Sequence, residues 1–458
     1  TMLYDCLQID KNSSVPLYQQ IYNSIKTAVE QGALSKDTKL PSIRKLSDSL
    51  LVSKTTVESA YHQLCAEGYI RNVPRSGYRV NAEITKTEGN VFRSESTNPK
   101  QEHRIYRFDF GTKAVDNSTA NLKVWKKYVR DILNREYLLN TYGEPQGELS
   151  LRKSLEKYSF SVRGVNCSEN NIVIAAGTQL LLYILCGLMG KELKIAIEKG
   201  AYIQAEQAFR DLRHNIVYCP LDKHGVIPDF IKSEKPDFLV LNPNSTGKDR
   251  KAMPIERRIK LIKAAKEVHC TIVEDDYNGE LRYTTRPIPA MQSLDSNQVV
   301  YMGSFSKILL PGVRIGYMVL PHFLLEKYRT VSAYYNQTAS KTEQLALSRY
   351  IDDGKLEAHL RKARKQYSLK SQKLCECMKS RFKNKLLKYR INETSLTADF
   401  LLNTSLSETD IYTLLLNNDI NTVKQRDDFN LTLSFSGIDL EKIEEAVDCI
   451  YSSLLTSL

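Results

Sequence analysis

The sequence has few of the residues on which several classes of protein depend. Its nine cysteines include no CxxC pair, and an odd number suits no disulfide framework, so we expect reduced thiols in a cytoplasmic protein. Seven dispersed histidines form no HExxH motif and no Cys/His cluster, so we expect no metal site. The longest nearly apolar run, 180–190, is about half of the ~20 residues that a membrane span needs. Residues 1–10 lack a signal-peptide pattern, and we expect no membrane contact.

Glycine and proline are also sparse, at 20 and 14 of 458 residues, while hydrophobic residues make up 42% and charged residues 26%. This composition is typical of a packed globular protein, and the length fits two or three domains. The net charge of +12 allows a nucleic acid as a partner. Residues 1–80 hold ten Lys and Arg against seven Asp and Glu, so the charge alone does not locate a DNA-binding part.

The pattern of residues 1–80 is more informative than their charge. Apolar residues recur at helical spacing over 18–29, after a proline. Ser42 is placed to cap a second helix, and Ser53 a third helix over 54–68 whose exposed start is polar and basic. A helix, a short turn and such a helix predict a helix-turn-helix, although spacing alone fits a plain small helical domain too.

Residues 69–80 predict a two-stranded hairpin with a basic turn, which adds a wing. The runs PLYQQIY, LPSIRKLSDSLLVSKTTVESAYHQLCAEGYI and RSGYRV resemble the winged helix-turn-helix of the GntR family of bacterial regulators. The resemblance implies double-stranded promoter DNA as the partner. Leu51 departs from it, because the family often has Gly or a small polar residue there. The implied contacts are Ser42 and Arg44 on phosphate, Ser53, Lys54, Thr55 and Thr56 at the major groove, and Arg75 and Gly77 at the backbone or minor groove.

Residues 81–105 are polar, show no apolar period and predict a flexible linker between domains 1–80 and 106–458. From 106 onward, buried β-type runs alternate with helical stretches, which predicts an α/β fold with a mostly parallel sheet and helices on both faces. A long basic helix from Lys341 through Leu374, followed by further strands, predicts a smaller lobe, mainly 341–458. The predicted strands of the sheet are 172–176, 194–198, 238–242, 271–275, 299–303 and 317–320.

One lysine of this core follows a buried strand and has phosphate-binding residue types beside it. The run VVYMGSFSKILLPGVRIG places Ser304, Ser306 and Arg314 within ten residues of Lys307. A lone lysine is most often a solvated surface residue. Two hydroxyls and a guanidinium suit a phosphate dianion, however, and a desolvated amine suits Schiff-base formation with an aldehyde. No GxGxxG or GxxxxGK[ST] supplies another phosphate site. Phosphate and aldehyde together indicate pyridoxal 5'-phosphate (PLP).

Other strand ends carry the remaining groups that such a site needs. Gly177, Thr178 and Gln179 open a helix whose backbone N–H groups can reach the phosphate. Asp275 can hold the pyridine nitrogen protonated, and Tyr277 can bond the ring oxygen. The run LNPNSTGK supplies amide side chains at a third strand end. Each signal is weak alone, but carboxyl strand ends are where open α/β sheets bind ligands.

The runs YGEPQG, AAGTQ, EDDYNGELRYTTRPIPAMQSLD and GSFSKILLPGVRIGYMVLP resemble the aminotransferase-like, fold-type I domain of MocR regulators. The resemblance implies a large and a small PLP-transferase domain, a domain-exchanged, head-to-tail homodimer and PLP held as an internal aldimine on Lys307. In the loop of LNPNSTGK, Ser245 aligns with the pattern as well as Asn244 does. The other implied cofactor contacts are Asp275 at the pyridine nitrogen, Tyr277 and Asn244 near the ring hydroxyl, Tyr202 over the ring, Gly177, Thr178, Ser304, Ser306 and Arg314 on the phosphate, and Tyr142 from the other subunit.

The sequence departs from that pattern at Gln204 and Thr432, where the family has the arginines that hold an amino-acid carboxylate. Lys424 or Arg426 is a candidate substitute. We therefore expect a regulator that senses PLP, or PLP with a small amine, and that controls vitamin B6 synthesis. The alternatives are an active aminotransferase with an accessory DNA-binding head, and a relic core that only dimerises. The missing arginines weigh against turnover, because an aminotransferase binds amino- and keto-acid carboxylates in turn.

Overall fold

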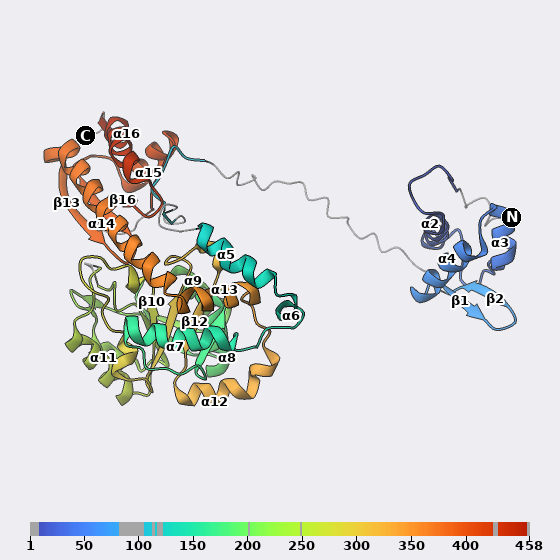
Figure 1. Ribbon diagram of the computed structural model, residues 1–458, viewed down its shortest axis with the longest axis horizontal. Coiled ribbons are helices and arrows are strands. Elements are labelled where there is room, and N and C mark those ends of the chain that lie inside the picture. The colour runs from blue at the N-terminus through green and yellow to red at the C-terminus, as the bar shows by residue number, and fades with distance from the viewer. Residues whose placement is uncertain are drawn as a thin grey trace. The chain divides into compact units, whose positions relative to one another are not determined.

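The protein forms two compact units, 1–104 and 105–458 (Figure 1). The structure is a computed structural model. It describes residues 9–81, 105–111, 115–116, 122–199, 202–247, 250–424 and 429–455. The predicted linker, 81–105, lies outside the described residues except for its two ends.

The N-terminal unit has the predicted winged helix-turn-helix arrangement. Helices α2 (Leu17–Glu30), α3 (Ile43–Leu50) and α4 (Lys54–Ala66) precede an antiparallel hairpin of β1 (Ile70–Val73) and β2 (Gly77–Val80). The apolar faces of the helices and of the hairpin bury one cluster, whose members include Ile21, Leu46, Tyr61, Leu64 and Val80. Burial of this cluster holds α4 against α2, α3 and the hairpin.

Serine side chains set the starts of the two helices of the motif. The Ser42 hydroxyl accepts a 3.2 Å bond from the Lys45 N–H, and the Ser53 hydroxyl accepts a 3.1 Å bond from the Thr56 N–H. Leu51 ends α3 in the left-handed region, with φ at 53°, and its side chain is 78% exposed. The departure at Leu51 is therefore a helix C-cap on the surface, where the strain of a left-handed leucine is accepted without a packing conflict.

The larger part of the C-terminal unit is a seven-stranded sheet in the order β4-β12-β11-β10-β9-β5-β6. Only β12 (Gly316–Val319) runs against its neighbours, and the other six strands are parallel, as predicted. The sequence did not predict β6, the strand at one edge of this sheet. The parallel strands are β4 (Ile172–Ala175), β5 (Lys194–Ile197), β6 (Asn215–Tyr218), β9 (Phe238–Leu241), β10 (Thr271–Asp276) and β11 (Val299–Ser304).

Helices cover this sheet and bury its two apolar faces separately. One face packs on the cluster that contains Leu181 and Phe209, and the other packs on clusters that contain Leu261 and Leu155. The helices of this lobe are α5 (Leu122–Leu133), α6 (Glu136–Leu139), α7 (Leu149–Arg163), α8 (Thr178–Met189), α9 (Ile203–Asp211), α10 (Pro228–Glu234), α11 (Ile255–Glu267) and α12 (His322–Val331). A small antiparallel hairpin, β7 (Leu221–Asp222) and β8 (Gly225–Val226), follows β6 in the chain.

The smaller lobe is an antiparallel sheet, β13-β14-β16, with helices on it. The single long helix predicted from Lys341 through Leu374 is wrong, because α13 (Lys341–Asp352) ends before Gly354, whose φ is 67°. A second helix, α14 (Lys355–Phe382), starts there, since a left-handed residue cannot continue the ladder of the first. The other elements are β13 (Leu386–Asn392), β14 (Thr397–Leu402), α15 (Glu408–Asn417), β15 (Ile420–Asn421), β16 (Leu431–Ser434) and α16 (Ile443–Leu454).

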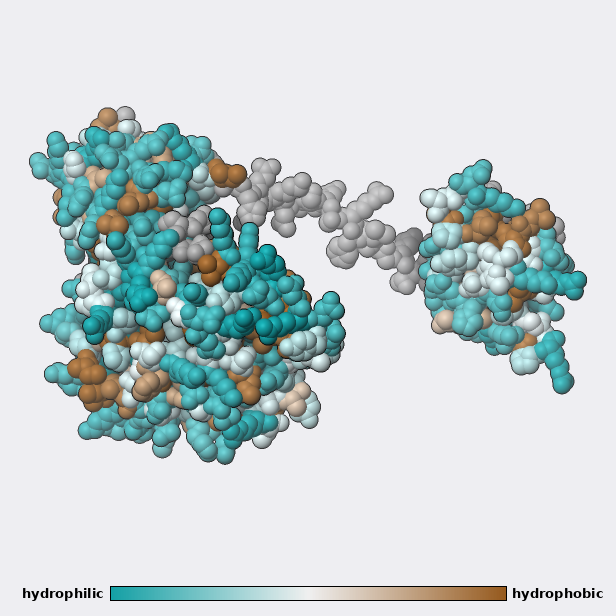
Figure 2. All heavy atoms as spheres, in the orientation of Figure 1, coloured by the Kyte–Doolittle hydropathy of each residue, from teal (hydrophilic) through white to brown (hydrophobic). Residues whose placement is uncertain are grey.

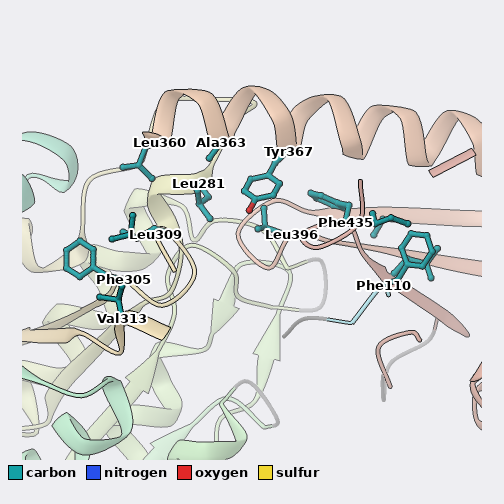
Figure 3. Close-up of a cluster of buried hydrophobic side chains, with 14 of the residues drawn as sticks. Phe110, Leu281, Phe305, Leu309, Val313, Leu360, Ala363, Tyr367, Leu396 and Phe435 are labelled. Atoms are coloured by element: carbon teal, nitrogen blue, oxygen red, sulfur yellow. The ribbon is translucent and has the colours of Figure 1, made fainter. Parts of the chain in front are cut away.

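The first strand of the C-terminal unit belongs to the smaller lobe. Strand β3 (Phe108–Asp109) pairs in parallel with β15, and the Ser434 N–H donates a 2.8 Å bond to the Phe110 carbonyl. Figure 3 shows Tyr367 of α14 and Phe435, which follows β16, in the apolar cluster that continues through Leu281 to Phe305. One continuous core therefore joins the two lobes.

The visible face of the C-terminal unit is largely hydrophilic, with brown, apolar side chains in small groups (Figure 2). Within the described ranges, no helix is long and apolar enough to cross a membrane.

Candidate cofactor site and DNA-binding surface

A cavity of about 430 Å³ opens at the carboxyl edge of the large sheet. The edge collects polar side chains because the strands that end there are parallel. Most of the predicted cofactor residues line this cavity, although the sequence separates them widely. The lining comprises Gly177, Thr178, Gln179, Ile197, Tyr202, Gln204, Val240, Leu241, Asn242, Ser245, Arg250, Asp275, Tyr277, Ser304, Ser306, Arg314 and Ser395.

One corner of the cavity has the donors that a phosphate requires. Gly177 precedes the N-terminus of α8, where unpaired N–H groups and the helix dipole favour an anion. Arg314 donates a 3.3 Å bond to the Ser306 hydroxyl. Gly177 has φ of 99°, and a Cβ on it would lie 2.9 Å from Arg314 Nη2. Only glycine therefore lets the guanidinium approach the start of the helix so closely.

The lining of the cavity also has an acid and two phenols. Burial, and next the charge of Asp276, raise the pKa of the Asp275 carboxyl to about 7. Burial also raises the pKa of Tyr277 and that of Tyr202, whose hydroxyl is hydrogen-bonded to Thr178. A carboxylate destabilised in this way gains most from a cation that faces it, and the protonated ring nitrogen of PLP is such a cation.

Lys307 lies beside the cavity and not in its lining. Its side chain is buried, and Nζ donates a 3.4 Å bond to Ser436 Oγ of the smaller lobe. Burial lowers the pKa of the Lys307 amine to about 8, and the charge of Asp109 opposes that shift in part. Because only a neutral amine attacks an aldehyde, this environment raises the reactive fraction near neutral pH.

The structure directs Asn244 away from the cavity. Its amide Nδ2 donates a 2.7 Å bond to Asp276 Oδ1, and Arg163 Nε lies 2.6 Å from the other oxygen of that carboxylate. Ser245, the alternative in the sequence, lines the cavity instead. Asn244 does not line the cavity, and its amide is bonded to the carboxylate of the buried Arg163–Asp276 pair. Nothing in the sequence near Asn244 indicates that pair.

The two positions that depart from the family pattern have different surroundings. Gln204 lines the cavity. Thr432 does not, because its hydroxyl donates a 2.8 Å bond to Asp399, which also binds Arg390 at 2.7 Å. Lys424 lies over the ring of Tyr412, at 4.5 Å, outside the lining of the cavity. The other suggested substitute, Arg426, lies outside the described residues.

Tyr142 is fully exposed and does not line the cavity of its own chain. The sequence predicts that it reaches the site of a second subunit. In the parts of the chain that the structure describes, no group of His, Cys, Asp and Glu side chains is arranged to hold a metal ion.

The predicted DNA contacts come from the starts of α3 and α4 and from the hairpin turn. Arg44, Lys54 and Thr55 are exposed near the starts of α3 and α4. The hydroxyls of Thr55 and Thr56 each lie 2.7 Å from the Ser53 hydroxyl. Arg75, with φ of 64°, and Gly77, with φ of 87°, form the hairpin turn. A cap that also binds two threonines fixes the side chains with which α4 would meet base edges.

Two family models match the chain. Residues 17–80 match the bacterial regulatory proteins of the gntR family, and residues 107–450 match aminotransferase class I and II. Among solved structures, an archaeal alanine:glyoxylate aminotransferase has a TM-score of 0.68 and 19% identity over 78% of this chain and 93% of its own. The solved structure supports the fold, fold type I, as predicted.

Curated relatives are similar to more than three quarters of the chain. An uncharacterized HTH-type transcriptional regulator of Bacillus subtilis, YdeL, is 39% identical over 79% of each chain. The probable rhizopine catabolism regulatory protein MocR of Rhizobium meliloti is 28% identical over 79% of this chain and 77% of its own. The HTH-type pyridoxine biosynthesis transcriptional regulator PdxR of Corynebacterium glutamicum is 26% identical over 78% of this chain and 77% of its own.

The aminotransferase class implies PLP, and three features of the cavity and its surroundings fit that cofactor. They are the glycine at which Arg314 meets the start of α8, the Asp275 carboxyl with its raised pKa and the buried Lys307 amine with its lowered pKa. The two family models and the curated relatives confirm the resemblance to MocR regulators. The chain belongs to the HTH-type transcriptional regulators that combine a gntR-type DNA-binding domain with an aminotransferase class I and II domain.

Proposed function

We propose that PLP is the signal of this regulator and that its binding in the cavity changes the affinity of the protein for promoter DNA. One observation carries the proposal. The groups expected for the ring, the phosphate and the aldehyde gather at one sheet edge, whereas neither family position for a substrate-carboxylate arginine is a guanidinium. A site equipped for the cofactor and not for a family-type amino-acid substrate suits sensing better than turnover.

When bound, PLP supplies an aldehyde that a neutral amine attacks. Lys307 would provide that amine, and Asp275 would keep the ring nitrogen protonated. Arg314, Ser304 and Ser306, with the N-terminus of α8, would hold the phosphate. Tyr202 and Tyr277 would cover and bond the ring. The cofactor contact of Asn244 passes to Ser245 in this proposal, because Ser245 lines the cavity.

The controlled genes would be those of vitamin B6 supply. PLP is the product of that supply, so a regulator that binds it closes a feedback loop. The name of the Corynebacterium glutamicum relative, a pyridoxine biosynthesis regulator, supports this assignment. The protein would act as a homodimer with exchanged domains, and the full exposure of Tyr142 suits a residue that completes the partner's site.

The test is fluorescence anisotropy of the full-length protein on a labelled duplex from the promoter upstream of its own gene, titrated with PLP. Pyridoxamine 5'-phosphate is the matched control, because it has the ring and the phosphate but no aldehyde. The proposal expects PLP to change the DNA dissociation constant at least tenfold and the control to change it less. Saturable PLP binding without any change in DNA affinity would contradict it.

A further inference from the structure

The exposed face of α4 lines a polar groove in the N-terminal unit. The opposite face of this helix is buried and carries Val57, Ala60, Tyr61 and Leu64. Five of the six residues that line the groove come from the exposed face, and Tyr18 of α2 is the sixth. In a helix-turn-helix, the exposed face of the second helix enters the major groove of DNA. The side chains that base edges would meet there are Thr55, Glu58, Ser59, His62 and Gln63.

Glu58 contributes a carboxylate to this groove that is not bonded within the described parts of the protein. Lys54 lies four positions earlier on the same helix, but neither it nor any other described residue forms a hydrogen bond or an ion pair with Glu58. Its neighbours differ in this respect. The Thr55 hydroxyl lies 2.7 Å from the Ser53 hydroxyl, and Gln63 Nε2 donates a 3.1 Å bond to Glu67. The Glu58 carboxylate is therefore free to accept hydrogen bonds from a ligand.

An acid at this position weakens DNA binding unless a base supplies a donor to it. The phosphates on either side of the major groove repel a carboxylate. The hydrogen-bond donors that base edges present in the major groove are the N4 amino group of cytosine and the N6 amino group of adenine, whereas guanine and thymine present acceptors. Adenine also has the acceptor N7 beside its amino group, and cytosine has no acceptor there. A carboxylate in this place therefore favours cytosine over the other three bases.

The position of Glu58 on the helix indicates where in the DNA site this base would lie. Thr55 and Glu58 are three residues apart on α4, so their Cβ atoms are neighbours at about 5–6 Å. Successive bases along one DNA strand are about 3.4 Å apart along the helix axis. The base that Glu58 meets should therefore lie within about two base pairs of the base that Thr55 meets.

We propose that Glu58 accepts a hydrogen bond from the N4 amino group of a cytosine in the promoter site, and that this contact determines which base is preferred at that position. The inference rests on DNA binding by the gntR-type domain. It goes beyond the proposed function, because the contact does not involve PLP.

The experiment selects bound duplexes from a library with randomised positions, using the full-length protein, and sequences them. We expect the wild type to prefer cytosine at one position of its site by about ten- to hundredfold. Glu58→Gln should change that preference to adenine, whose N6 and N7 suit an amide, and leave the other positions unchanged. Glu58→Ala should lose the preference and bind duplexes without the cytosine more tightly than the wild type does, since the repulsion is gone.

Asp48→Asn is the matched control, because Asp48 is an exposed acid of α3 that does not line the groove. It removes the same charge and should leave the base preferences as they are. Unchanged preferences in Glu58→Gln, or an equal change in Asp48→Asn, would overturn the proposal. A uniform gain in affinity of Glu58→Gln for all duplexes would also overturn it, since Glu58 would then act by its charge alone.

The selection is carried out with and without PLP, so that the two proposals can fail separately. Equal DNA affinity in the two conditions would contradict the proposed function and still show whether Glu58 determines a base. The melting temperature of Glu58→Gln should equal that of the wild type, because the side chain is exposed and makes no bond that the substitution removes.

Discussion

Lys307 of the large lobe donates its hydrogen bond to Ser436, which follows the last strand of the smaller lobe. The Ser436 and Ser434 hydroxyls lie 2.9 Å apart, and the Ser434 N–H binds the Phe110 carbonyl. The amine that would react with PLP therefore lies two hydrogen-bonded residues from the segment that follows the predicted linker. These hydrogen bonds connect Lys307 to Phe110 at the start of the C-terminal unit.

The rate of PLP capture should follow the titration of Lys307. Since burial lowers its pKa from the ordinary 10.5 to about 8, the neutral, attacking form grows as pH rises through 8 and is nearly complete by about pH 9. Stopped-flow absorbance with excess PLP between pH 6.5 and 10.5 measures this. A rate that continues to rise up to pH 10.5 would show an ordinary solvated lysine and contradict the assignment.

Asp275→Asn should have effects of opposite sign on stability and on cofactor binding. The folded pKa of about 7 lies above the ordinary 3.8, so the folded state holds this proton to a higher pH than the unfolded state. The free energy of unfolding then falls as pH rises through about 4 to 7, and the loss is complete above pH 7. At pH 8 the cofactor-free variant should melt about 2–4 °C higher than the wild type, while its PLP affinity falls at least tenfold.

Thermal melts without PLP and absorbance titrations with PLP give the two quantities. Asp352→Asn is the control, because Asp352 is an exposed acid at the end of α13 and should change neither. A lower melting temperature together with lower PLP affinity would mean that Asp275 stabilises the empty fold, against this account.

Two glycines that flank α8 allow the phosphate corner to be tested. Gly177 and Gly190 both have positive φ, 99° and 110°, so alanine strains the backbone at either position by about 1 kcal/mol or more. Only at Gly177 does the new Cβ approach Arg314; at Gly190 it meets nothing within 4 Å. Urea denaturation should show similar losses in the free energy of unfolding for the two variants. PLP affinity should fall about tenfold or more in Gly177→Ala alone. An equal fall in both variants would mean that the region around Gly177 and Arg314 does not bind the phosphate.

Substitutions in the N-terminal unit should distinguish phosphate contacts from base contacts. Arg44→Ala should weaken binding to all DNA sequences alike and lower the salt slope of the affinity by about one. Thr55→Ala should change which sequence is preferred, because Thr55 lies at the exposed start of α4. Binding isotherms on operator and scrambled duplexes at several salt concentrations measure both. A selective effect of Arg44→Ala on sequence preference would reverse the two roles.

The winged helix-turn-helix was predictable to within two residues at each helix end. Ser42 and Ser53 are local signals, since a capping hydroxyl bonds an N–H only three residues away. The buried strands of the large sheet were predictable for a similar reason, as continuous apolar runs. Strand β13 was missed because it is an edge strand with mostly exposed side chains, including Leu387 and Lys388, and carries no such run.

The orientation of site residues depended on partners far away in the sequence. Asn244 has the amide expected of a ring contact, but Asp276, 32 residues later, takes it. Arg250 was not singled out at all. Its place in the cavity results from the pairing of Thr246 with Lys251 and from the packing of Gly247 on β7, and neither gives a periodic signal. Residue types at strand ends indicated the chemistry of the site, and tertiary packing decided which of these residues line the cavity.

The central claim is that the reaction of PLP with Lys307 changes DNA affinity. Anisotropy isotherms on the promoter duplex, with and without PLP, should be compared for the wild type and Lys307→Ala, with Lys327→Ala on the exposed face of α12 as the control. The account predicts a shift of at least tenfold in the wild type and the control, and no shift in Lys307→Ala, which also lacks the visible absorbance of attached cofactor. An equal PLP-dependent shift in Lys307→Ala would contradict it.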